Sequence, residues 1–349
     1  MNNTNRQPVS LPKIKLAGYL LALIIIILAV VKFLPQITTL ENSIIVLRSM
    51  SVWLVILAVA AQVCSYLGSG YLLKTIVNLG QSRLSIFRGA LITMAGASIG
   101  LVAGGWLSTA AVTYRLIGKS EIPSEEAALA GFLPPLYNTA LLLIISTAGL
   151  VYLLVIHQLS RAQMLIIILL LSVFGLGILL ILYGIKHQEK VELLVLWLVN
   201  HLGKLLRRTY DAAPIRNMID KIYIGLKLLL NGRWKEPVLG AGLNIVFDML
   251  TLYFLFMAAG NAANPGVLIA GYGVSILLQR GVFFIPGGIG VIEGGMVAIY
   301  TSLGIPGTIS VVVILSYRLI SFWIPSLLGF AVAVYLQKTQ ADIQSQKPL

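Results

Sequence analysis

The stretch from Phe284 to Gly295 interrupts a long apolar region with residues that a membrane-spanning helix seldom contains. It combines one proline and five glycines with a carboxylate, Glu293. Proline removes a backbone hydrogen-bond donor, and glycine weakens a helix. A broken backbone at membrane depth survives only where protein or a water-filled cavity shields it. The stretch therefore predicts an interior site, and an ionisable residue in such a place predicts function.

The composition places this stretch in a membrane protein. Of 349 residues, 58% are hydrophobic and only 11% are charged, which predicts an all-α polytopic protein with residues 1–349 in one integral membrane domain. The net charge of +13 fits cytoplasmic loops and anionic lipid headgroups, so we expect no nucleic-acid partner. The histidines are scattered and there is one cysteine, so we predict no metal site and no cofactor. We also find no catalytic motif.

Apolar runs of spanning length predict about six full spans. They cover residues 17–34, 49–73, 127–156, 164–185, 238–259 and 309–336. A short outer loop is expected over residues 35–43. The cations near both ends of the chain predict cytoplasmic N- and C-termini, an uncleaved first helix and a place in the inner (plasma) membrane.

Two further apolar segments are broken by glycine. Residues 84–114 have cations on both flanks, Arg83 before them and Arg115 after them, which indicates that both flanks are cytoplasmic. Residues 267–303 start and end beside loops without charge, which indicates that both flanks lie outside. Each segment therefore predicts a re-entrant helix pair, and the two pairs enter from opposite faces. The alternative is a conventional bundle in which each segment crosses fully.

Opposed re-entrant pairs predict inverted repeats, here over residues 47–156 and 238–336. Secondary transporters are often built from such repeats, with the substrate held near the midplane by broken helices. Residues 186–236 carry a net charge of +5 and predict a cytoplasmic amphipathic linker between the repeats. The linker either lies in the membrane interface or packs on the bundle as a helical hairpin.

The glycine motifs resemble those of the YbhN/UPF0104 family, which shares its membrane domain with the lipid-flipping half of lysylphosphatidylglycerol synthases. The resemblance rests on Ala103-Gly104-Gly105 through Leu116, and on Pro286-Gly287-Gly288-Ile289-Gly290 ahead of Glu293, and extends over most of residues 47–336. It implies movement of an anionic or aminoacylated lipid between leaflets, or handling of a related lipid-linked substrate. Residues 106–110 lack the carboxylate that many relatives carry there. The chain also ends soon after its last predicted helix, so we expect no synthase activity.

Candidate site residues follow from charge at membrane depth. The substrate-binding candidates are Tyr114, Arg115, Asp248, Arg280, Glu293 and Arg318. The planar guanidinium groups suit a lipid phosphate, and the glutamate suits an arginine or a cationic headgroup. Alternatively, Glu293 forms a structural pair with an arginine, and the Arg115 side chain extends to the membrane–water interface. Asp248 is either a proton or cation site or a hydrogen-bond partner between two helices. The predicted re-entrant gates are formed by Gly104, Gly105, Pro286, Gly287, Gly288 and Gly290.

These observations favour a lipid transporter or flippase-like protein with a cavity between inverted repeats. Its expected partner is an anionic or aminoacylated membrane phospholipid. A second copy of the chain and a lipid-modifying enzyme are the candidate protein partners. Two alternatives stay open: a membrane enzyme that modifies a headgroup with Glu293 as acid or base, and a non-catalytic membrane partner of a soluble enzyme.

Overall fold

The computed structural model describes residues 40–345 with gaps, and every secondary-structure element in that part is helical. The gaps are residues 79–81, 104–105, 119–123, 156–160, 206–212, 214, 218, 221–222, 225–231, 282–287 and 289. The predicted gate residues Gly104, Gly105, Pro286 and Gly287 lie outside the described residues.

The helices follow one another in two groups joined by a linker. The first group holds α2 (Leu40–Ser49), α3 (Val52–Val77), α4 (Ile86–Ala103), α5 (Trp106–Gly118) and α6 (Ser124–Val155). Then come α7 (Arg161–Lys186) and α8 (Gln188–Leu205). The second group holds α10 (Lys235–Ala258), α11 (Pro265–Gly281), α12 (Val291–Ser302), α13 (Gly307–Arg318), the π-helical turn η4 (Leu319–Trp323) and α14 (Ile324–Ser345).

Four of the described helices are long and apolar enough to cross a membrane: α3, α6, α10 and the continuous α13–α14. They correspond to four of the six predicted spans. The predicted span 164–185 lies within the helix α7, which is not among these four, and the predicted span 17–34 lies outside the described residues. The predicted loop 35–43 is wrong at its end, because α2 begins at Leu40. This helix packs against α13 at one end of the bundle, a tertiary contact that the local sequence does not record.

Helices α3 and α10 cross as an antiparallel pair at the centre of the bundle. Gly68 and Gly240 let the backbones approach: a Cβ at Gly68 would lie 2.6 Å from the amide nitrogen of Asn244, and one at Gly240 would lie 2.7 Å from Cα of Leu72. The Asn244 side chain donates hydrogen bonds to the carbonyl oxygen and Oγ of Ser65, at 3.1 and 2.9 Å. Small residues and interhelical hydrogen bonds are the usual means of association in lipid, where apolar contact gives little preference.

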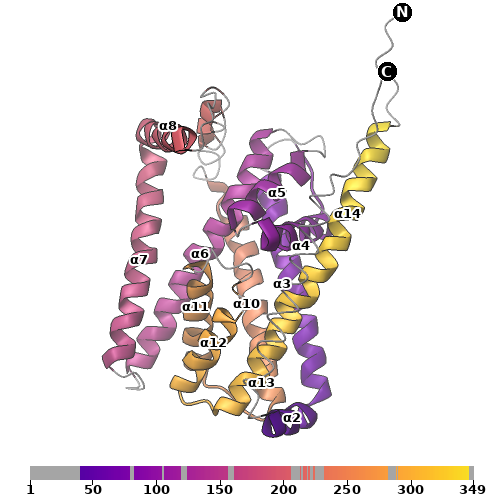
Figure 1. Cartoon of the computed structure of the whole chain (residues 1–349), viewed down its shortest axis with the longest axis vertical. Coiled ribbons are helices and arrows are strands. Elements are labelled where there is room, and N and C mark those ends of the chain that lie inside the picture. Colours follow the sequence, from indigo (N-terminus) through magenta and orange to yellow (C-terminus); the bar gives the residue numbers. More distant parts are fainter. Residues whose placement is uncertain are drawn as a thin grey trace, which may run out of the picture.

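Two pairs of shorter helices lie toward opposite ends of this crossing (Figure 1). Helices α4 and α5 lie near the upper end in the view, and α11 and α12 lie in the lower half. The 13 residues of α5 and the 12 of α12 extend roughly 20 and 18 Å, less than the hydrocarbon thickness of about 30 Å. Each pair has its own apolar cluster, one including Ile92 and Ile117 and the other including Tyr272 and Ile292.

The linker begins with an amphipathic helix. α8 runs at a steep angle to α7 in Figure 1, and its apolar residues Leu193, Leu194 and Trp197 are 69%, 63% and 61% exposed. Neighbouring residues at spacings of one, three and four lie on the same side of a helix. At the start of residues 186–236, which were predicted to form the linker, α8 is thus a helix whose apolar side is uncovered in the described part of the chain.

Candidate functional site

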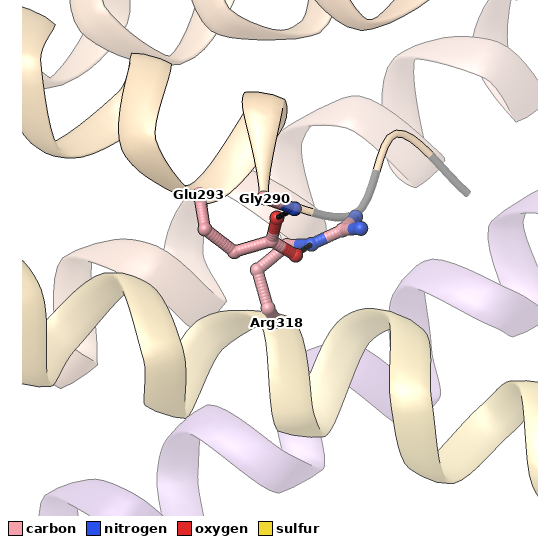
Figure 2. A network of polar contacts seen from close by, with 3 residues as sticks. All are labelled: Gly290, Glu293 and Arg318. Atoms are coloured by element: carbon pink, nitrogen blue, oxygen red, sulfur yellow. Dashed lines mark hydrogen bonds and ion pairs between the residues drawn. The ribbon is translucent and has the colours of Figure 1, made fainter. Parts of the chain in front are cut away.

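The glycine-rich stretch from Phe284 to Gly295 contains one member of a buried ion pair, Glu293. Arg318 Nε donates to Glu293 Oε1 at 2.7 Å, and the two side chains are only 4% and 6% exposed. The backbone N–H of Gly290 donates to the other carboxylate oxygen, Oε2, also at 2.7 Å. Figure 2 shows the two side chains meeting between the start of α12 and the end of α13. Both carboxylate oxygens of Glu293 are therefore engaged.

The local sequence explains why the carboxylate lies here. Gly290 precedes α12 with φ of +86°, a conformation that side chains with a Cβ rarely adopt. Glu293 is the third residue of the helix and turns back to bind the N–H of Gly290, as the acidic member of a capping box does. The negative charge also stands at the positive end of the helix dipole. The glycine and the acid thus form one local unit.

Arg318 stands at the junction of α13 and the π-helical turn η4. Its guanidinium lies 4.0 Å from the centroid of the Phe322 ring, which gives a cation–π contact. Tyr66 of α3 donates a hydrogen bond to the carbonyl oxygen of Ser321 in η4, at 3.1 Å. Single π turns inside α-helices are frequent at functional sites, because they free carbonyl groups and shift the side chains that follow.

A second carboxylate, on a half-buried residue, lies beside this pair. Oδ2 of Asp248, in the middle of α10, accepts hydrogen bonds from the hydroxyls of Tyr272 and Tyr317 at 2.6 and 2.7 Å. Tyr317 is the residue before Arg318, so one turn of α13 contacts both acids. The cluster joins four helices of the second group to α3, and its charged members are Asp248, Glu293 and Arg318.

The predicted site residues separate into two groups. Asp248, Glu293 and Arg318 lie together, whereas Tyr114 and Arg115 are exposed on α5, toward the other end of the bundle (Figure 1). Arg280 belongs to α11, but its side chain lies outside the described part. Of the predicted gate glycines, Gly288 and Gly290 are described, and both have positive φ.

Sequence reasoning missed the neutral partners in this cluster: Gln62, Tyr66, Tyr272 and Tyr317. Their signal was present but weak, since each is a polar side chain inside an apolar helix. The described residues contain no group of three or more His, Cys, Asp or Glu side chains able to hold a metal ion.

Comparisons with known proteins agree with the motif pattern. The family described as "Lysylphosphatidylglycerol synthase TM region" matches residues 17–329. A UPF0104 membrane protein of Methanocaldococcus jannaschii, MJ1595, is 29% identical over 142 residues, which are 40% of this chain and 41% of that protein. One of Methanothermobacter thermautotrophicus is 22% identical over 153 residues, 42% of this chain and 44% of that protein. A third, PH1989 of Pyrococcus horikoshii, is 37% identical over 82 residues, 24% of each chain. Each alignment thus spans less than half of the relative's length.

Proposed function

Because this chain belongs to the family of the lysylphosphatidylglycerol synthase transmembrane region, as its two glycine motifs predicted, we propose that it moves a phospholipid between the leaflets of the membrane. The substrate has an anionic or aminoacylated headgroup. The headgroup enters a cavity between inverted repeats while the acyl chains stay in lipid. The observation that carries this proposal is the buried Glu293–Arg318 pair at the start of the short helix α12.

The packing of the helices supports inverted repeats. α3 and α10, the first long helices of the two groups, cross antiparallel. α4 packs on α14, where Gly329 faces Met94 and Ser98, and α11 packs on α6, where Gly149 faces Ala270. In each contact, the first short helix of one group packs on the last long helix of the other group. A twofold axis in the membrane plane would relate two such contacts to each other. In this arrangement α4–α5 and α11–α12 are re-entrant pairs that enter from opposite faces.

Charge supports an orientation in the membrane. Helix α8 and the start of α10 carry Lys190 and Lys235 at the upper end of the view in Figure 1, the end from which α4–α5 enter. The loops at the opposite end, residues 260–264 and 303–306, have no charged residue. By the positive-inside rule the upper end is cytoplasmic, and the protein is a multi-pass plasma-membrane protein with cytoplasmic termini.

The ion pair suggests how a headgroup is received. A guanidinium binds a phosphate through two parallel hydrogen bonds, so a lipid phosphate can replace Glu293 as the partner of Arg318. The released carboxylate can then accept the ammonium group of an aminoacylated headgroup. In the resting protein both oxygens of Glu293 are engaged, which favours this exchange of partners over a free general acid or base.

The test is a leaflet-resolved assay in proteoliposomes that contain phosphatidylglycerol or lysylphosphatidylglycerol. We expect the wild-type protein to move at least one of them faster than protein-free vesicles do. Arg318→Lys should retain a charge but lose the planar fork, and so should slow the movement strongly. The matched control, Glu236→Gln on the exposed first turn of α10, should behave as the wild type does.

The same vesicles separate the alternatives. A covalently altered lipid would favour a membrane enzyme. If neither lipid moves and neither is altered, a non-catalytic partner of a soluble enzyme becomes the better reading. If Arg318→Lys moves lipid at the wild-type rate, the role given to the ion pair is wrong.

A further inference from the structure

Asp248 has a hydrogen-bond environment that the ion pair of the proposed lipid site does not explain. It lies in the middle of α10 and is half-buried. Its Oδ2 atom accepts both tyrosine hydroxyls, Tyr272 at 2.6 Å and Tyr317 at 2.7 Å. Hydroxyl donors are neutral, so these two bonds position the carboxyl group without balancing a negative charge.

Gln62 supplies an independent observation on the opposite helix. Its side chain, 6% exposed on α3, hydrogen-bonds Asp248. Its oxygen Oε1 is buried and accepts no hydrogen bond from the described residues. A buried acceptor without a donor is costly, and it indicates a donor that is supplied in another state. Rotation of the amide by half a turn exchanges its oxygen and nitrogen at nearly constant shape, and would turn the oxygen toward Asp248.

A proton on Asp248 fits this arrangement. In the ionised state the carboxylate accepts from both tyrosines and from the Gln62 amide nitrogen. In the protonated state Oδ1–H donates to Gln62 Oε1 after the amide has rotated, while Oδ2 keeps both tyrosines. Each of the four side chains then keeps at least one hydrogen-bond partner in either state. The only covalent change is the O–H bond at Oδ1, where one proton is gained or lost, and the only other change is the exchange of the hydrogen bond between Gln62 and Asp248.

The charged groups around Asp248 are compatible with a proton on its carboxyl group. The groups that face Asp248 are Gln62 and Tyr66 from α3, Tyr272 from α11, and Tyr317 and Arg318 from α13. From α6, also packed on α10, no titratable group of the described residues contributes at Asp248. Arg318 is bound to Glu293, so the described cluster holds two acids and one arginine. The side chain of Arg280, further along α11, lies outside the described residues.

We propose that Asp248 is a reversible proton-binding site. The Gln62 amide changes its orientation when the proton binds, and Tyr272 and Tyr317 hydrogen-bond the carboxyl group in both states. Proton occupancy thereby acts on the contacts of α10 with α3, α11 and α13. The contact of α10 with α3 joins the second group of helices to the first, so the site lies where a proton gradient can bias one arrangement of the two groups over the other. The proton site goes beyond the proposed lipid movement and does not depend on which lipid is carried.

The test is infrared difference spectroscopy of the full-length protein in phosphatidylglycerol nanodiscs, between alkaline and acidic pH. We expect a carbonyl stretch of a protonated, buried carboxyl group that is lost in Asp248→Asn. Gln62→Met removes the acceptor of the Oδ1–H group and should shift this band to higher frequency without abolishing it. The exposed control Glu236→Gln should leave the band unchanged.

Two results would overturn the proposal: no buried-carboxyl band at any pH at which the protein stays folded, or an identical band in Asp248→Asn. If Asp248→Asn fails to fold, the Gln62→Met shift decides the question alone, and an unshifted band counts against the site. Because the spectra require no lipid movement, failure of the flippase proposal and failure of the proton site can be told apart.

Discussion

Glu293→Gln is the substitution whose effect the structure defines most closely. The carboxylate offers one oxygen to Arg318 Nε and the other to the Gly290 N–H, each at 2.7 Å. The glutamine amide offers a single oxygen, so in either orientation its NH₂ group faces one of these donors. The substitution also leaves the Arg318 guanidinium, whose side chain is 4% exposed, without its carboxylate.

The expected cost follows from that geometry. Removing one partner of a buried ion pair destabilises a protein by about 3–5 kcal/mol, mainly through the uncompensated charge. Arg318→Met should cost a similar amount, since it strands the carboxylate. The double variant Glu293→Gln/Arg318→Met contains no buried charge at this position, so its loss should fall below the sum of the single losses by about 0.5–3 kcal/mol.

The assay is reversible unfolding in mixed detergent micelles, followed by helical circular dichroism for the four proteins of this cycle. The exposed Glu236→Gln should change the free energy of unfolding by less than about 1 kcal/mol. If Glu293→Gln changes it as little, or if the single losses simply add, the pair does not stabilise the fold in the way the distances indicate.

Three further outcomes are expected. Gly240→Ala should separate α3 from α10 and destabilise the fold in the same unfolding assay, because the new Cβ would lie 2.7 Å from the Leu72 backbone. The control Gly242→Ala should be neutral or stabilising, because a Cβ there would have no heavy atom of another helix within 4 Å in the described part of the chain. With the native cysteine replaced, cysteines at Ser85 and Arg115 should react with an impermeant reagent from the same side of the membrane, and reaction from opposite sides would refute a re-entrant α4–α5 pair. Retained as the single tryptophan, Trp197 of α8 should be quenched by brominated anionic lipids, and an absence of quenching would place α8 away from the interface.

Helix limits were largely predictable, because apolar runs of spanning length and their flanking cations directly reflect the cost of polar groups in lipid. α3, α6 and α10 each lie within a few residues of their predicted limits. α2 was missed because its packing on α13 is a tertiary contact. For the site, charge at membrane depth selected Asp248, Glu293 and Arg318, but it selected Tyr114 and Arg115 equally, and these are exposed on a different helix pair.

The sequence by itself determined that the chain is a helical membrane protein of this family and that its backbone breaks ahead of Glu293. Only the tertiary structure decided that Arg318, 25 residues further along, is the partner of that acid, and that Tyr272 and Tyr317 bind Asp248. The physical reason is that the partners lie on different helices, and the rotation and crossing of these helices determine which side chains meet. A periodic pattern shows which residues share a side of one helix, whereas close approach at points such as Gly68 and Gly240 determines which sides of different helices meet.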